Sequence, residues 1–257
     1  MGTYGHFARV YDRFMEEVPY EEWGNYIERL FLQNQLQPKI IAELGCGTGN
    51  MTEIMSQKGY EMIGIDLSED MLMIAKEKAL QKKMDILYLA QDIRDFELYG
   101  TVDCFISICD TMNYLLEEEE LKQVFQLVNT YLNPGGFFIF DMNTEYKYHQ
   151  TLASNTFTDV QEQTAYIWEN NYDLESQINE YIVNFFVQDE EGTSYTRFEE
   201  VHYQRAYQIE TITKLLSDAG LEVVEVYDAF TFQPPAIDSE RIYFIAKETR
   251  KKGGNNQ

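Results

Sequence analysis

The sequence predicts a doubly wound α/β fold, with a seven-stranded and mostly parallel sheet that carries a small inserted antiparallel β-sheet. Residues 39–142 alternate short apolar runs with amphipathic stretches, which is the pattern of βαβ units. Residues 144–206 change to apolar–polar alternation without long helical stripes, which is typical of antiparallel strands with one covered face. A helix and two more strands follow the insert, so the main sheet gains two further members.

Most elements of the parallel part have a local signal at one end. A helix begins near Asn50 and is expected to stop at Gly59, and another begins after Ser68, whose side chain suits an N-cap. A turn at 133–136 precedes the fifth strand. The strands are expected at 39–44, 60–65, 86–90, 102–109, 137–141, 221–229 and 241–247, and the later helices at 117–132 and 208–219.

The chain divides into four expected parts. Residues 1–36 form two N-terminal helices that act as a lid, residues 37–143 and 207–248 form the core domain, and residues 144–206 form the insert. Residues 249–257 are a polar tail that is expected to fray. The aromatic stripe of the first helix is also what ordinary packing on the sheet would require, so both interpretations of this segment stay open.

The composition excludes several classes of protein. Apolar residues make up 44% of the 257 residues and aromatic residues 14%, which excludes a disordered chain, and no apolar run reaches the ~18 residues that a membrane span needs. The 20 Lys and Arg against 44 Asp and Glu give a net charge of −24, which repels nucleic acid at long range. The amino-terminal segment lacks the pattern of a signal peptide, so we expect a cytoplasmic protein with reduced cysteines. Three scattered histidines and three cysteines form no metal-ligand motif.

The segment from Glu43 to Asn50 is the most informative in the sequence. It follows a strand, opens a helix and reads E-x-G-x-G-x-G, so its backbone can approach a ligand closely beside a helix N-terminus. The dinucleotide spacing G-x-G-x-x-G is absent, because Asn50 occupies the last position. Asp66 ends the next strand, where a carboxylate can accept hydrogen bonds from both ribose hydroxyls.

At these residues the chain resembles the class I S-adenosylmethionine-dependent methyltransferases, and the resemblance covers most of residues 39–247. ELGCGTGN is similar to their first motif, IGIDLSEDML to their acidic second strand, AQDIR to the segment that holds the adenine, and VDCFISICD and LNPGGFFIFDMN to their fourth and fifth strands. YGHFARVYDRFM, CDTMNYL and the insert resemble a bacterial, small-molecule-type subgroup. The resemblance implies the sheet order 3-2-1-4-5-7-6, with strand 7 antiparallel.

The resemblance also implies the cofactor, S-adenosyl-L-methionine, and its product form, S-adenosyl-L-homocysteine. The glycines would line the amino-acid end, Asp66 would bind the ribose, and Asp92 would accept from the adenine amine. A structural role for Asp92 as a cap near Arg94 stays open. The implied cofactor-binding set is Tyr4, Tyr11, Glu43, Gly45, Cys46, Gly47, Gly49, Asp66, Leu67, Asp92, Ile93 and Asp110.

Groups near the tips of the fourth and fifth strands and on the insert should face the methyl group. Asp110 and Tyr114 are the candidate catalytic residues, although a loop carboxylate and a core tyrosine are the plain alternatives. The candidate substrate residues are Asn113, Asn143, Trp168, His202 and Arg205. The Asn/Asp-Pro-Pro-Tyr sequence of enzymes that methylate amides or adenine amines is absent, which favours other acceptors.

The sequence therefore predicts a methyltransferase that acts on a small molecule through oxygen or nitrogen, as a monomer or a homodimer. Three alternatives stay open: a tRNA-modifying methyltransferase, a nucleotide-dependent oxidoreductase and a non-catalytic cofactor-binding module.

Overall fold

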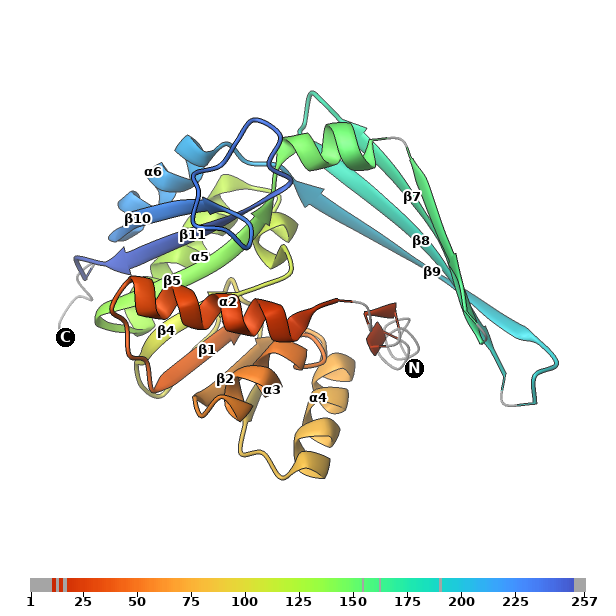
Figure 1. Ribbon diagram of the computed structural model, residues 1–257, viewed down its shortest axis with the longest axis horizontal. Helices are drawn as coiled ribbons and strands as arrows, with labels where there is room; N and C mark the ends of the chain where they lie inside the picture. The colour runs from red at the N-terminus through yellow and green to blue at the C-terminus, as the bar shows by residue number, and fades with distance from the viewer. Residues whose placement is uncertain are drawn as a thin grey trace.

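The computed structural model describes residues 11–12, 14–15, 18–153, 155–161, 163–189 and 191–251, and it contains two sheets (Figure 1). The main sheet has seven strands in the order β10-β11-β5-β4-β1-β2-β3, which confirms the expected order. Its strands are β1 (Ile40–Leu44), β2 (Glu61–Asp66), β3 (Leu87–Ala90), β4 (Val102–Ser107), β5 (Leu132–Asn143), β10 (Leu221–Asp228) and β11 (Arg241–Glu248).

Five strands of this sheet are parallel, and β11 runs antiparallel to both β5 and β10. Strand β4 ends two residues earlier than expected, because Cys109 and Asp110 adopt positive φ angles of 64° and 53° and turn the chain into the short 3-10 helix η1 (Thr111–Tyr114). The expected turn at 133–136 lies within β5 instead, where the pairing with β4 shifts register.

Helices cover both faces of the main sheet. Helices α2 (Tyr20–Gln33), α3 (Asn50–Gln57) and α4 (Glu69–Lys82) pack on one face, and α5 (Glu118–Tyr131) and α6 (Ile209–Ala219) pack on the other. The predicted cap of α4 is confirmed, since the Ser68 hydroxyl accepts a hydrogen bond from the Met71 N–H. Each described helix is too short or too polar to span a lipid bilayer.

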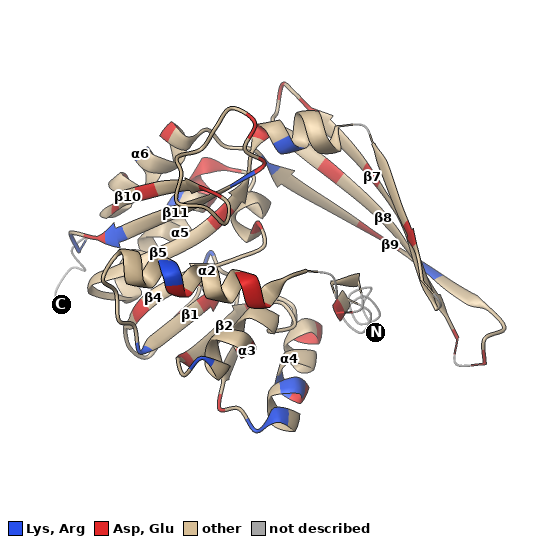
Figure 2. Ribbon diagram, viewed as in Figure 1, with Lys and Arg blue, Asp and Glu red and all other residues tan. Residues whose placement is uncertain are grey.

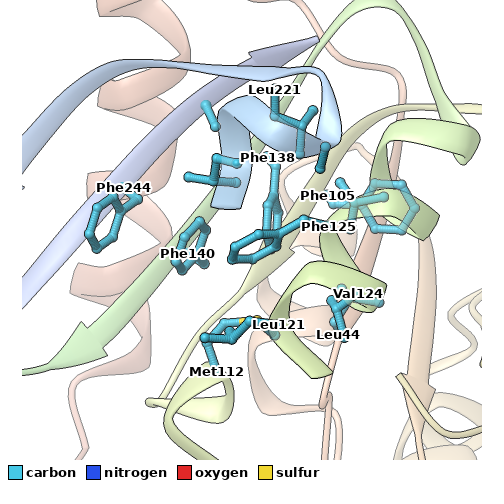
Figure 3. Packing of buried hydrophobic residues seen from close by; sticks show 14 of the residues in the cluster. Leu44, Phe105, Met112, Leu121, Val124, Phe125, Phe138, Phe140, Leu221 and Phe244 are labelled. Carbon is cyan, nitrogen blue, oxygen red and sulfur yellow. The ribbon is translucent and has the colours of Figure 1, made fainter. Parts of the chain in front are cut away.

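Aromatic side chains form the centre of the face under α5 and α6. Phe138 and Phe140 of β5 lie 4.5 Å apart between ring centroids, and Phe140 stacks on Phe244 of β11 at 5.0 Å. Phe125 of α5 contacts both β5 rings, as Figure 3 shows. The close packing of these rings holds α5 over the central strands. It therefore also fixes the position of the carboxyl edge of the sheet.

The insert is a four-stranded antiparallel sheet that projects from the main body (Figure 1). It contains β6 (Thr156–Val160), β7 (Thr164–Asp173), β8 (Ile178–Gln188) and β9 (Tyr195–Arg205). The sequence pattern predicts three of these strands. Neither β6 nor the preceding π-helix η2 (Lys147–Leu152) is predicted, because each is too short to show a clear period.

Candidate cofactor and acceptor site

The loop between β1 and α3 places three glycines at the carboxyl edge of the main sheet. Gly45, Gly47 and Gly49 have φ angles of 72°, 54° and 79°, which L side chains rarely adopt. A Cβ atom on Gly45 would overlap Thr111, and one on Gly49 would overlap the Tyr88 hydroxyl. A Cβ atom on Gly47 would meet nothing within 4 Å. Gly47 is therefore the position where the loop borders open space.

Asp66 lies beside this glycine loop at the end of β2. Its carboxylate accepts hydrogen bonds from the Gly47 N–H at 2.7 Å and the Ser68 N–H at 2.9 Å. Burial raises the pKa of the Asp66 carboxyl above its usual value, although the backbone N–H groups oppose this. The structure thus brings together the loop and the carboxylate that the sequence places at adjacent strand tips.

Two predicted residues lie beneath the glycine loop. Glu43 exposes 3% of its surface, accepts a hydrogen bond from the Thr52 hydroxyl of α3, and has its pKa raised to about 8 by burial. Cys46 packs in the cluster that contains Tyr88 and Ala75. Both residues support the loop from inside and also line a small cavity beside it.

The residues predicted to hold the adenine lie at the tips of β2 and β3. Leu67 is 68% exposed, and Ile93 packs at the margin of the core. The Asp92 carboxylate binds the Arg94 guanidinium, at 2.7 Å from Nη2, and accepts from the Arg94 N–H at 2.8 Å. These contacts lower the pKa of the Asp92 carboxyl, and Arg94 also binds Glu120 at 2.5 Å. Arg94 is thus the structural partner of Asp92, as one interpretation of the sequence allowed. The contact stabilises a turn and does not cap a helix.

The described part of the N-terminal segment covers the glycine loop. Tyr11 lines a cavity of about 40 Å³ together with Gly45, Gly47 and Cys109, and burial raises the pKa of the Tyr11 phenol well above its usual value. Tyr4, the other predicted aromatic group at this place, lies outside the described residues.

Asp12 fixes the same segment to two helices. Its carboxylate accepts from the Thr48 hydroxyl at 2.5 Å and from the Asn50 amide at 3.1 Å, and it forms an ion pair of 2.8 Å with Lys78 of α4. Sequence reasoning missed Asp12, since a single acidic residue in an amphipathic segment has no distinguishing pattern.

Phe14 joins the N-terminal segment to the insert. Its ring lies 4.7 Å from that of Phe185 on β8 and 5.7 Å from that of Tyr166 on β7. The glycine loop, the N-terminal segment and the insert therefore form one continuous wall around the carboxyl edge of the sheet.

A buried ion network lies at the tips of β4 and β5. Arg241 of β11 binds Asp110 at 2.6 Å and also binds Asp141, while Gln204 of β9 donates to Asp110 at 2.6 Å. Burial alone would raise the pKa of Asp110, but Arg241, Lys147 and Gln204 together hold it below its usual value. Asp110 is therefore a paired carboxylate that is poorly suited to accept a proton. Arg241 was missed, because a strand arginine near the C-terminus has no local signal.

Three predicted substrate residues serve as structural ties. The Asn113 amide donates to the backbone oxygens of Asn143 and Arg205 and accepts from the Asn143 N–H, which uses both ends of this fully buried group. The Asn143 side chain accepts from Lys147 at 2.9 Å. Arg205 donates to the Leu116 carbonyl at 2.7 Å and lies over the Tyr207 ring. These hydrogen bonds give Asn113, Asn143 and Arg205 structural roles, and their part in holding an acceptor stays a prediction.

The remaining predicted residues lie on the inner face of the insert, or against it. The rings of Tyr114 of η1 and His202 pack in a T-shaped arrangement, with 5.8 Å between their centroids. Burial lowers the pKa of His202, which favours its neutral form. Trp168 packs between Phe157 and Tyr181, with centroids 5.2 and 5.4 Å away. These aromatic groups form the apolar surface that the sequence predicts for the insert.

No three His, Cys, Asp or Glu side chains of the described residues are placed to hold a metal ion. A wider cavity, of about 370 Å³, opens between η2 and the loop before β11. The residues that line it include His149, Tyr207 and Ile237, and none of the predicted cofactor residues is among them. The glycine loop and the inner face of the insert thus remain the candidate site.

Comparison with known proteins agrees with this geometry. Residues 41–136 match a family model described as a methyltransferase domain. A protein of Geobacillus sp. (strain WCH70) that is named as a methyltransferase is 36% identical over 96% of this chain and 100% of its own length. The crystal structure of an S-adenosylmethionine-dependent methyltransferase from Clostridium acetobutylicum ATCC 824 is 32% identical, with a TM-score of 0.85 over 96% of this chain and 99% of that one.

A more distant solved structure shares the fold. CalS10 from Micromonospora echinaspora, described as an amino pentose methyltransferase with S-adenosylmethionine bound, is 18% identical, with a TM-score of 0.74 over 93% of this chain and 97% of that one.

Replacing Gly47 by alanine tests whether the open side of the loop contacts the cofactor. Because the new methyl group meets no protein atom, we expect the free energy of unfolding to fall by only ~1–2 kcal/mol, which is the cost of the left-handed conformation for alanine. We expect the dissociation constant for S-adenosylhomocysteine, measured by calorimetry, to rise at least about tenfold. The matched control is Gly59→Ala, which also has a positive φ and open space but lies away from the loop. Equal effects of both variants on binding would contradict the assignment.

The raised pKa of Glu43 predicts a pH dependence of stability. The folded state retains a proton between the ordinary glutamate pKa of 4.5 and about 8, whereas the unfolded state releases it. The stabilisation that the protonated Glu43 gives to the folded state is fully present below pH 4.5. It is lost as the pH rises through 8, and the free energy of unfolding falls by up to ~1.4 kcal/mol per pH unit. Glu43→Gln should therefore show a shallower decline of unfolding free energy in urea between pH 5 and 8. Parallel curves for the two proteins would refute this prediction.

Proposed function

We propose that this chain, which belongs to the S-adenosylmethionine-dependent class I methyltransferases, transfers the methyl group to a small molecule that binds under the insert. The observation that carries the proposal is the continuous wall made by the glycine loop, Tyr11, Phe14 and the insert. This wall surrounds the carboxyl edge of the sheet, where open α/β sheets bind their ligands.

The cofactor would lie along the tips of β1, β2 and β3. Gly47 leaves open space where a ligand can approach the backbone, and Asp66 stands beside it with a carboxylate suited to ribose hydroxyls. Leu67 is exposed at the tip of β2 and can cover the adenine, while Asp92 and Ile93 would border its edge. Tyr11 would close the cleft above the glycines.

The bound cofactor supplies an electrophilic methyl group on a sulfonium. The protein must then align the acceptor with the S–CH3 bond and exclude water. Tyr11, Tyr114 and the aromatic residues of the insert would form the apolar walls. The neutral His202 could take a proton from the acceptor if its nucleophilic atom carries one, whereas Asp110 is held ionised and paired by Arg241.

Charge and shape both favour a small acceptor. The net charge of −24 opposes the phosphates of a tRNA, and Figure 2 shows acidic residues spread over the core and the insert. CalS10, a fold neighbour, is described as acting on an amino pentose, which is in keeping with this size class.

Asp66→Asn tests the ribose assignment. Loss of the charge-assisted hydrogen bonds should weaken S-adenosylhomocysteine binding by roughly ten- to hundredfold, or about 1.5–3 kcal/mol, in a calorimetric titration. Asp103→Asn is the matched control, because the Asp103 carboxylate also accepts from two backbone N–H groups, at 2.8 and 3.1 Å, at the opposite edge of the sheet. Unchanged binding in Asp66→Asn would place the ribose elsewhere.

A screen of small molecules and tRNA for a methyl-group gain in mass tests the acceptor class, and Trp168 then tests its location. Trp168→Ala should lower the transfer rate to the acceptor found by at least about tenfold, while S-adenosylhomocysteine affinity stays within about threefold. Ile167→Ala removes a neighbouring apolar side chain from the outer face of β7 and should keep near wild-type transfer. Methylation of tRNA alone, or equal activity of both variants, would overturn the proposal.

A further inference from the structure

Glu200 is a buried acid on the inner face of the insert. It belongs to β9, exposes 5% of its surface, and lies opposite Val183 of β8 in the ladder. Phe198 and His202 are two residues away on either side, so all three side chains point to the same face of the sheet. Aromatic and aliphatic groups therefore surround this carboxyl group.

Among the residues that the structure describes, the Glu200 carboxylate has no ion-pair partner. Its Oε1 is buried without a hydrogen bond among the described residues, which costs free energy unless a ligand supplies a donor. Burial raises the pKa of the Glu200 carboxyl, and neighbouring cations do not oppose this.

Within the described part of the chain, four basic side chains of the neighbouring elements are engaged elsewhere. Arg205 donates to the Leu116 carbonyl, Arg241 binds Asp110, and Lys147 donates to Asn143. Arg197 lies on the outer face of β9 with Asn184 and Glu199. The uncompensated charge therefore faces the interior of the site.

The position of Glu200 links the two halves of the inner face. Its ladder partner Val183 packs against the cluster of Phe185, Phe14 and Tyr11 and also against the cluster of Tyr148 and Tyr181. The first cluster reaches the glycine loop through Tyr11, and the second reaches Asp110 through Gln204, which accepts from the Tyr148 hydroxyl at 3.0 Å. A ligand at Glu200 would thus lie between these clusters.

We propose that Glu200 binds an ammonium group of the acceptor, so that the acceptors of this enzyme are cationic amines in which another atom, with a free lone pair, receives the methyl group. An ammonium group supplies the N–H donors that the buried carboxylate lacks, and the aromatic rings nearby favour a cation through their faces. The inference rests on the proposed function, because it identifies the class of acceptor held under the insert.

The test compares a cationic probe with its neutral counterpart. Protein saturated with S-adenosylhomocysteine is titrated with 2-phenylethylammonium and with 2-phenylethanol, and binding is followed by ligand-observed NMR. The wild-type protein should bind the ammonium probe at least about tenfold more tightly than the alcohol. Glu200→Gln should reduce this preference to less than about threefold.

Glu199→Gln is the matched control, because it removes the same charge from the outer face of the same strand and should keep the preference. Glu200→Gln should also melt at the wild-type temperature or above it, since it removes an uncompensated buried charge, whereas a structural role would lower the melting temperature. The absence of an ammonium preference in the wild-type protein, or its persistence in Glu200→Gln, would overturn the inference.

Two cofactor titrations separate the remaining explanations. If Glu200→Gln weakens binding of S-adenosylmethionine but not of S-adenosylhomocysteine, the carboxylate faces the sulfonium and the amine inference is wrong. If neither the wild-type protein nor the variants bind S-adenosylhomocysteine, the assignment of the cofactor site is wrong, and so is the proposed function. Normal cofactor binding without an ammonium preference overturns only the inference about Glu200.

Discussion

The two ion pairs of Arg241 connect β11, the tips of β4 and β5, and the insert. The guanidinium extends from β11 and binds two buried carboxylates, Asp110 after β4 and Asp141 within β5. Asp110 in turn accepts from Gln204, which begins the stem between the insert and the core. Two buried carboxylates beside one another repel, and the Arg241 guanidinium is the largest favourable charge for both, so its loss would remove most of their compensation. Arg241 thereby acts with the hydrogen bonds of Asn113 and Arg205 to hold the insert to the core.

The two halves of the site use different chemistry. The cofactor half consists mainly of backbone, because glycines with positive φ and a strand-tip carboxylate leave room for a ligand of fixed shape. The acceptor half consists of side chains on a sheet that packs through aromatic rings. The family model accordingly matches residues 41–136, which contain the glycine loop and Asp66 and end before the insert.

Local signals in the sequence predicted most of the core. Apolar runs marked the strands, Ser68 marked the start of α4, and the glycine spacing and Asp66 marked two adjacent strand tips that the structure brings together. Interactions between distant residues were not predictable in this way. Asn113 reads as a polar group near the methyl, yet its partners are backbone atoms 30 and 92 residues away. Arg241 and Asp12 likewise acquire their roles only when the chain folds back on itself, and no periodicity or motif records such contacts.

The N-terminal segment couples the cofactor side of the proposed site to the insert. Asp12 is fixed to Thr48 and Lys78 beside the cofactor cleft, and Phe14 two residues later packs on the insert. The free energy that a bound nucleoside contributes to seating this segment is also available to the acceptor chamber, and the reverse holds by thermodynamic reciprocity. A ligand on either side of this segment should therefore raise the affinity for the other by the same factor. A stretch of a few residues thereby makes two binding events, on separate sheets of the protein, thermodynamically dependent on one another.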